Sequence, residues 1–157
     1  MAEPTVIGVI SDTHSYFDPA LETLFAGVAH IVHAGDFGTP DVLERLRVLA
    51  PLTAVCGNVD RPFFLGELPW EAEVTVAGLR VLVAHIGHDL MARHDPVAEG
   101  YGMVVSGHSH RARVEWRGAT LFLNPGYAGK PRFGDPRSVA LVTVRDGVPE
   151  AEVVPLG

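Results

Sequence analysis

The sequence has little cysteine, no long hydrophobic run and no excess of basic residues. Cys56 is the only cysteine among the 157 residues, so no disulfide forms within the chain, which is compatible with a reducing cytosol. No apolar stretch approaches the roughly twenty residues that span a bilayer. The first residues also lack the basic patch of a signal peptide. We therefore expect a cytoplasmic protein with no membrane partner.

The balance of charge is acidic, with 12 basic and 19 acidic residues and a formal net charge of -7. Nucleic-acid backbones are bound through clusters of lysine and arginine, which this composition hardly supplies. General nucleic-acid binding is therefore not expected. An acidic chain can still bind a small phosphate ester if divalent metal ions supply the local positive charge.

Length and composition favour a single globular domain over residues 1–157. Hydrophobic residues make up 47% of the chain and charged residues 20%, which fits neither disordered nor fibrous proteins. A chain of this length buries one core but is short for two independent ones. No internal repeat, low-complexity segment or linker interrupts it.

The first part of the chain alternates buried strands with amphipathic helices. Strands are expected at residues 6–10, 30–34 and 52–56. Asp18-Pro19 predicts the start of a helix with an apolar face that reaches Val28, and Thr39-Pro40 predicts a second helix. This alternation is typical of βαβ units around a parallel sheet.

The second part is richer in strands and contains the sequence pattern of hairpins. Ala77-Gly78 separates two strands, Arg117-Gly118 and Asp146-Gly147 mark further turns, and a short helix is expected near residues 89–99. The strands expected here cover residues 73–76, 80–85, 103–106, 112–116, 120–123, 139–144 and 151–154. Two packed sheets flanked by helices, an α/β fold, accommodate both parts of the chain.

Oxygen or imidazole side chains stand at the end of five of the expected strands. The segments concerned are Ser11-Asp12-Thr13-His14, Gly35-Asp36, Gly57-Asn58, His85 and Gly107-His108-Ser109-His110. In open α/β sheets, ligands bind beyond the carboxyl ends of the strands. These side chains are therefore expected to meet in one crevice.

Seven such ligands suit two metal ions better than one. Asp12 and His14 are two residues apart, which places both on one side of an extended segment, and a carboxylate such as Asp36 can bridge two ions. Oxygen and nitrogen donors without thiolate favour manganese, iron, nickel, zinc or cobalt over copper(I) or an iron–sulfur cluster. We expect two divalent ions, with manganese first among these.

Each motif taken alone has a plainer interpretation. An isolated Asp-x-His is a weak signal, and glycine beside aspartate or asparagine is ordinary turn chemistry. It is the joint occurrence of the motifs at successive strand ends that favours a metal centre.

Several other residues are assigned structural or solvent-exposed positions. His30 and His33 are expected to be partly buried, His88 and His94 to lie at the surface, and Cys56 to be a core residue. Two further groups leave alternatives open. Basic residues near the motifs either bind phosphate or are only solvated, and aromatic residues form a stacking wall, a subunit contact or loop packing. The basic residues are Arg111, Arg113, Lys130 and Arg132, and the aromatic residues are Phe63, Phe64 and Trp70.

The motif series from Ser11 to Asn124-Pro125-Gly126 resembles the calcineurin-like metallophosphoesterase superfamily, in particular its small prokaryotic YfcE-like phosphodiesterase branch. The resemblance implies a four-layer α-β-β-α sandwich of two mixed sheets, a hydrolase acting on small phosphate esters, and a possible dimer. It implies that Asp36 and Asn58 have catalytic roles. One ion would be held by Asp12, His14, Asp36 and His110, and the other by Asp36, Asn58, His85 and His108.

The chain departs from that family at one position. Many members carry Gly-Asn-His-Glu, whereas this chain carries Gly57-Asn58-Val59-Asp60, and valine cannot donate a proton to a leaving group. Asp60 either orients a neighbouring ligand or caps a turn. The alternative to an enzyme is a non-catalytic interaction scaffold of the same fold, as in the retromer subunit vacuolar protein sorting 29. Because every ligand position is filled, we favour the enzyme.

Overall fold

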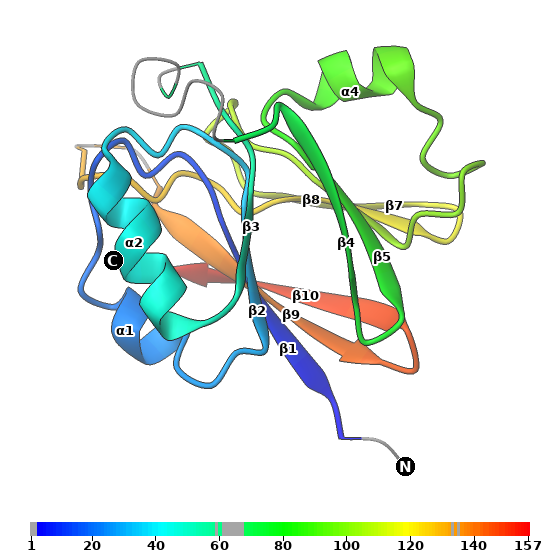
Figure 1. Ribbon diagram of the computed structural model, residues 1–157, viewed down its shortest axis with the longest axis horizontal. Coiled ribbons are helices and arrows are strands. Elements are labelled where there is room, and N and C mark those ends of the chain that lie inside the picture. The colour runs from blue at the N-terminus through cyan, green and yellow to red at the C-terminus, as the bar shows by residue number, and fades with distance from the viewer. Residues whose placement is uncertain (1–2, 59, 61–67, 133, 135) are drawn as a thin grey trace.

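Two five-stranded mixed sheets pack face to face in the computed structural model, which describes residues 3–58, 60, 68–132, 134 and 136–157 (Figure 1). The first sheet has the order β10 (Val148–Pro155), β9 (Ser138–Arg145), β1 (Thr5–Ile10), β2 (His30–His33) and β3 (Leu52–Ala54). The second has the order β4 (Glu71–Val76), β5 (Leu79–Ala84), β6 (Met103–Val105), β8 (Thr120–Asn124) and β7 (Arg113–Arg117).

Each sheet combines three neighbouring parallel strands with antiparallel strands. Strands β1, β2 and β3 run parallel, as do β5, β6 and β8, while β9, β4 and β7 pair antiparallel with their neighbours. The hairpin turns lie where the sequence predicts them, with left-handed backbone at Ala77-Gly78 and Asp146-Gly147. Because the central strands are parallel, their carboxyl ends reach one side of the molecule.

The main core lies between the two sheets. Alternate residues of β1, such as Ile7 and Val9, are fully buried and belong to one cluster with Val81 and Val83 of β5. Alternation in both sheets places apolar side chains on the inner faces.

Helices cover the outer faces and complete the four layers. Helices α1 (Leu21–Leu24) and α2 (Pro40–Leu49) lie on the first sheet, where Leu21 and Leu46 pack with Ile31 of β2 (Figure 1). On the second sheet, Leu90 of α4 (Gly87–Arg93) packs with Tyr101 and Leu82. This arrangement confirms the predicted α/β sandwich. None of the described helices is long and apolar enough to cross a membrane.

Two of the predicted helices are shorter than expected. The helix after Asp18-Pro19 is confined to residues 21–24, and the chain then turns through Gly27 at φ +78°. Its expected apolar face is nevertheless buried, because Phe25 and Val28 pack into the same cluster. The helix expected near residues 89–99 ends at Arg93. The residue before a proline disfavours helical backbone, and Asp95 precedes Pro96.

Candidate metal centre

The ends of β1, β2 and β5 and the segment after β6 bring five of the seven predicted ligands together. Asp12 and His14 follow β1, Asp36 follows β2, and His85 follows β5. The fifth, His110, lies in the segment after β6. Two groups of three have ligand atoms within 4.8 Å of one another, Asp12 with His14 and His110, and Asp12 with Asp36 and His85. The structure therefore brings these strand ends together, as the sequence predicts.

The backbone at these ligands is held in an unusual conformation. Asp12, His14, Asp36, His108 and His110 all have positive φ, between 45° and 70°. Non-glycine residues rarely adopt this region, and each such residue costs on the order of 1 kcal/mol or more. Five such residues at one edge indicate that the surrounding structure imposes the geometry of the site.

The glycines in the motifs allow the loops to approach one another closely. A Cβ atom at Gly57 would lie 2.2 Å from Asp36 Oδ1, and one at Gly107 would lie 2.1 Å from Ser11 Oγ and 2.7 Å from Asp12 Oδ2. A side chain at either position would push a candidate ligand out of place. Gly57 alone suggests an ordinary turn, but both glycines lie close to the carboxylates of other loops, which leave no room for a side chain.

Three buried polar atoms of the site have no hydrogen-bond partner among the described residues. These atoms are Asp12 Oδ1, His14 Nε2 and His85 Nε2. Asp12 Oδ1 lies 3.3 Å from His110 Nε2, 3.8 Å from His14 Nε2 and 4.0 Å from His85 Nε2. Buried polar atoms are almost always hydrogen-bonded. Unpaired lone pairs that point into one small space are the donor arrangement that a bound cation requires.

The imidazole of His85 is oriented by the neighbouring sheet. Its Nδ1 donates a hydrogen bond to the carbonyl oxygen of Ala34 at 2.9 Å, because that oxygen can only accept. This bond leaves the lone pair on Nε2, 3.1 Å from Asp36 Oδ2. Burial lowers the pKa of His85, but the neighbouring carboxylates of Asp36 and Asp12 outweigh it, so the pKa is raised overall.

The carboxylate common to both groups of three is Asp12, whereas the resemblance implied that Asp36 bridges the ions. The two carboxylates share the space between the groups, since Asp36 Oδ2 also lies 3.7 Å from His14 Nε2. The division of ligands between two ions therefore stays a prediction.

The remaining two predicted ligands, Asn58 and His108, lie at the side of the cluster. The ring of His108 contacts that of His85 edge to face, with centroids 5.2 Å apart. Asn58 is exposed and lines a groove of about 210 Å³ together with His85, Trp70 and Arg93. His108 contacts His85, and Asn58 lines the same groove as His85, but neither belongs to the two groups of three, so their roles as ligands of a second ion stay a prediction.

Asp60 fastens the loops that carry Asp36 and Asn58. It is fully buried, and its Oδ2 accepts hydrogen bonds from the backbone N–H of Asp36 and of Gly57, while Oδ1 accepts one from Gly38. Burial raises the pKa of Asp60 although these hydrogen bonds oppose the shift. Of the two interpretations of Asp60, the orienting one therefore fits the contacts.

His33 supports the site through hydrogen bonds to two of its loops and was not predicted as part of it. It is fully buried rather than partly buried, and its Nδ1 accepts the backbone N–H of Gly35, so that Nε2 donates to Thr13 Oγ1. Burial lowers the pKa of His33 well below its ordinary value, which keeps the ring neutral. The ring also stacks on Phe37, with centroids 3.5 Å apart.

Asn124 and Tyr127 are further supporting residues that sequence reasoning assigned no role. The amide of Asn124 donates to the carbonyl oxygen of Gly107 and to Ser109 Oγ. The ring of Tyr127 lies 5.0 Å from that of His110. They fix the loop that carries His108 and His110.

The other residues singled out in the sequence lie outside this cluster. His30 is hydrogen-bonded to Thr53, and Cys56 is buried. His88 is exposed as predicted, whereas His94 is largely covered between Glu71 and Glu99. Of the aromatic residues, Trp70 is exposed, while Phe63 and Phe64, like Val59, lie outside the described residues.

The comparisons with known proteins agree with this geometry. The calcineurin-like phosphoesterase superfamily domain matches residues 6–147. The chain is 33% identical to a protein named "probable metallophosphoesterase" from Methanothermobacter thermautotrophicus, over 97% of this chain and 93% of that protein. It therefore belongs to the calcineurin-like phosphoesterase superfamily, whose members depend on metal ions.

Two further similarities concern a phosphodiesterase and a solved structure of the same fold. The chain is 31% identical to the phosphodiesterase YfcE of Escherichia coli strain K12, over 64% of this chain and 58% of that protein. The predicted similarity to the YfcE-like branch is thus confirmed. The fold is also shared with Vacuolar Protein Sorting 29 from Cryptosporidium parvum, with a TM-score of 0.76, 18% identity and 98% of both chains covered.

Proposed function

We propose that this chain is a cytoplasmic phosphodiesterase that uses two divalent metal ions, manganese first among the candidates, to hydrolyse small phosphate esters. The observation that carries the proposal is the set of buried, unpaired donor atoms on Asp12, His14 and His85, which point into one space. Holding such atoms without partners costs free energy that a bound cation recovers. The names of the relatives support the same reaction class.

Two divalent ions bound here would supply the positive charge that activates a water molecule and neutralises the phosphate oxygens. The role of the protein is to hold the donor atoms of its side chains at fixed positions. Asp36 lies beside both His14 and His85, so we assign it contacts to both ions. Asn58 is a neutral ligand, so its ion keeps more positive charge for the phosphate than a third carboxylate would leave.

The position at which many superfamily members carry a proton-donating histidine is Val59 here. Without a proton donor at that position, departure of the leaving group depends on its own acidity. We expect aryl phosphodiesters to be hydrolysed faster than alkyl phosphodiesters. The measurement is kcat/KM over a series of leaving groups of falling pKa, and equal rates across the series would contradict the expectation.

A non-catalytic scaffold is the alternative, favoured by the similarity to Vacuolar Protein Sorting 29. The strained backbone at five candidate ligands supports the enzyme instead, because a scaffold gains nothing from that strain.

The predicted dimer is a separate question, and light scattering on the purified protein tests it.

The deciding experiment measures metal content and hydrolysis of bis-p-nitrophenyl phosphate together. The protein loaded with manganese should hold two ions per chain and hydrolyse the ester. Asp36→Ala should lose ions from both positions and lose turnover. Glu44→Ala, which removes an exposed carboxylate paired with Arg47, is the matched control. Full metal content and turnover in Asp36→Ala would overturn the assignment.

A further inference from the structure

A second groove, of about 430 Å³, begins beside the candidate metal centre and runs over the outer face of the second sheet. His108 and Asn124 line the end nearest the metal centre. From there the groove follows β7 from Arg113 to Arg117, four residues or about 13 Å. A groove of this volume and length takes a group the size of a nucleoside.

The floor and one wall of the groove are apolar. Val104 of β6 and Phe122 of β8 are paired neighbours that both point to the outer face, and Met91 of α4 also lines the groove. Met91 is 37% exposed. The guanidinium of Arg117 lies over the Phe122 ring, 4.8 Å from its centroid, so Val104 and the flexible thioether of Met91 are the apolar surface on which a flat ring can pack.

The opposite wall is positively charged. Arg113 and Arg117 line the groove, and none of its described lining residues is acidic, although the chain as a whole carries a net charge of -7. Both guanidinium groups pair with Glu115, Arg113 at 2.8 Å and Arg117 at 2.7 Å. One carboxylate between two guanidinium groups leaves one positive charge unbalanced, and phosphate is the group that paired guanidinium donors bind well.

We propose that this groove, which we call the β7 groove, binds the substituent of the phosphodiester substrate, and that this substituent combines a flat ring with a second phosphate, as in a nucleoside phosphate. The proposal rests on the function proposed above, because the ester to be cleaved would lie at the His108 end. The ring would lie against Val104 and Met91, beside the Phe122 ring that Arg117 covers, and the second phosphate against Arg113 and Arg117.

Three p-nitrophenyl phosphodiesters test this, since all release the same leaving group. In each, water supplies the oxygen of the new P–O bond and p-nitrophenolate departs with its electron pair. The retained group is methyl, thymidine through its 5′ oxygen, or the same thymidine with a 3′-phosphate. We expect kcat/KM to rise in that order, with about a tenfold gain from the 3′-phosphate.

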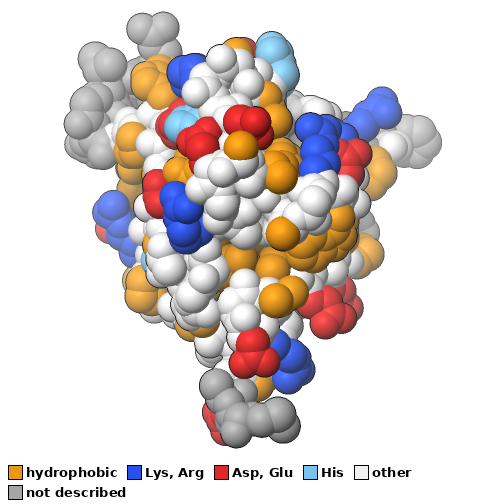
Figure 2. Space-filling model, turned by 90° about the vertical axis from the view of Figure 1, so that its right-hand side faces the viewer, with side chains coloured by type: hydrophobic (Ala, Val, Ile, Leu, Met, Phe, Trp, Pro, Cys, Tyr) orange, Lys and Arg blue, Asp and Glu red, His pale blue; other side chains and the backbone are white. Residues whose placement is uncertain are grey.

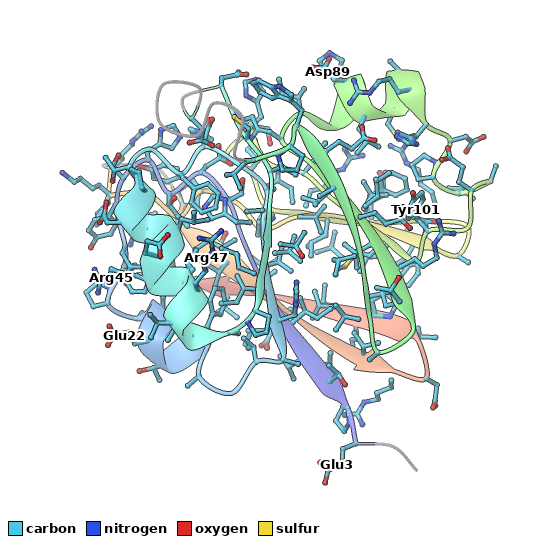
Figure 3. All side chains as sticks on the ribbon, viewed as in Figure 1. Glu3, Glu22, Arg45, Arg47, Asp89 and Tyr101 are labelled. Carbon is cyan, nitrogen blue, oxygen red and sulfur yellow. The ribbon has the colours of Figure 1, made fainter. Side chains whose placement is uncertain are left out.

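Variants of β7 then change that gain in opposite directions. Arg113→Gln combined with Arg117→Gln should lower the ratio between the two thymidine esters about tenfold. Glu115→Gln, which frees both guanidinium groups, should raise the ratio about threefold. Arg45→Gln is the matched control, because Arg45 is also an exposed arginine paired with a glutamate, Glu22. Figure 3 shows Arg45 and Glu22 on the far side of the molecule from Asp89 of α4.

Binding to the metal-free protein separates this proposal from the proposed hydrolysis. Calorimetric titration should give at least tenfold tighter binding of thymidine 3′-phosphate than of thymidine, and the double arginine variant should lose the difference. If this difference in binding is measured but no ester is hydrolysed, the proposed function is wrong and the proposal for the β7 groove is supported. If the loaded enzyme hydrolyses all three esters equally and the titrations show no preference for phosphate, the groove proposal is wrong.

Discussion

The space between the two sheets and the carboxyl ends of their strands are built on opposite principles. Ile7 and Val9 of β1 are fully buried and apolar in regular extended backbone, and only three residues later Asp12 is equally buried but charged and in left-handed backbone. Burying a charge costs free energy that apolar packing has to offset. The interior therefore stabilises the fold, and the strand ends use part of that stability to hold donor atoms.

Removing a ligand should separate function from stability most strongly. Asp12→Asn keeps an oxygen and a residue type that tolerates positive φ, but it removes one of two neighbouring buried carboxylates. We expect ester hydrolysis to fall about a thousandfold, by loss of metal, while the metal-free protein keeps or gains thermal stability. Turnover with manganese and melting curves in chelator measure the two effects. A variant that loses stability in chelator would contradict the comparison.

A deletion in the interior should have the reverse effect. Leu121 is fully buried in the cluster between the sheets, and Leu121→Ala leaves a cavity there. We expect the free energy of unfolding to fall by about 3 kcal/mol, measured by urea titration, with metal content unchanged in the folded protein. Val48→Ala on the exposed face of α2 is the control, since Val48 is 86% exposed.

Asp60 connects the two regions, so its removal should affect both. Asp60→Ala leaves three buried backbone N–H groups, those of Asp36, Gly38 and Gly57, without their acceptor. We expect a loss of about 2 kcal/mol in unfolding free energy, together with weaker manganese binding. Asp95→Ala is the control, because among the described residues Asp95 accepts one backbone N–H, that of Ala98, in an exposed loop. Equal effects of both variants would show that Asp60 is an ordinary turn residue.

The smallest expected effect lies away from both regions, at His94. Hydrogen bonds to Glu99 and then Glu71 raise the pKa of His94 above its ordinary value. Because the pKa is raised in the folded state, protonated His94 stabilises the folded protein fully below pH about 6.5. This stabilisation is lost as the pH rises through the pKa that His94 has in the folded protein. We expect a decline in Tm of about 1 to 2 °C over that interval, absent in His94→Gln. His88→Gln, at an exposed histidine of α4, should keep the decline.

The sequence was sufficient for the sheets and for the convergence of candidate ligands, because both depend on local patterns. Apolar runs predicted β1 and β9, and polar residues after successive strands predicted that Asp12, Asp36 and His85 would meet. Periodicity failed at the helix after Asp18, where the apolar spacing continues to Val28 but Gly27 adopts a turn. The apolar face is buried in either conformation, so spacing alone does not distinguish them.

Residues that act through contacts distant in the sequence could not be predicted. His33 and Asn124 look like ordinary strand residues, and only the folded chain shows that one supports Thr13 and the other the Gly107 loop. The apolar surface on the side of the molecule away from α1 and α2 could not be predicted from the sequence either. Figure 2 shows that hydrophobic side chains gather near the centre of this face with charged groups around them. Exposed apolar residues of β7 and β10 include Val114, Trp116 and Val148.

The closeness of Gly57 to Asp36 has a consequence for how chains of this family are compared. A Cβ atom at residue 57 would overlap Asp36 Oδ1, so exchanging this hydrogen for a methyl group would displace a ligand that the substitution itself leaves in place. A homologue with alanine there would keep all seven donor residues in an alignment and still lose its chemistry. Judging whether a distant homologue is an enzyme or a scaffold therefore requires inspecting the glycines as closely as the ligands.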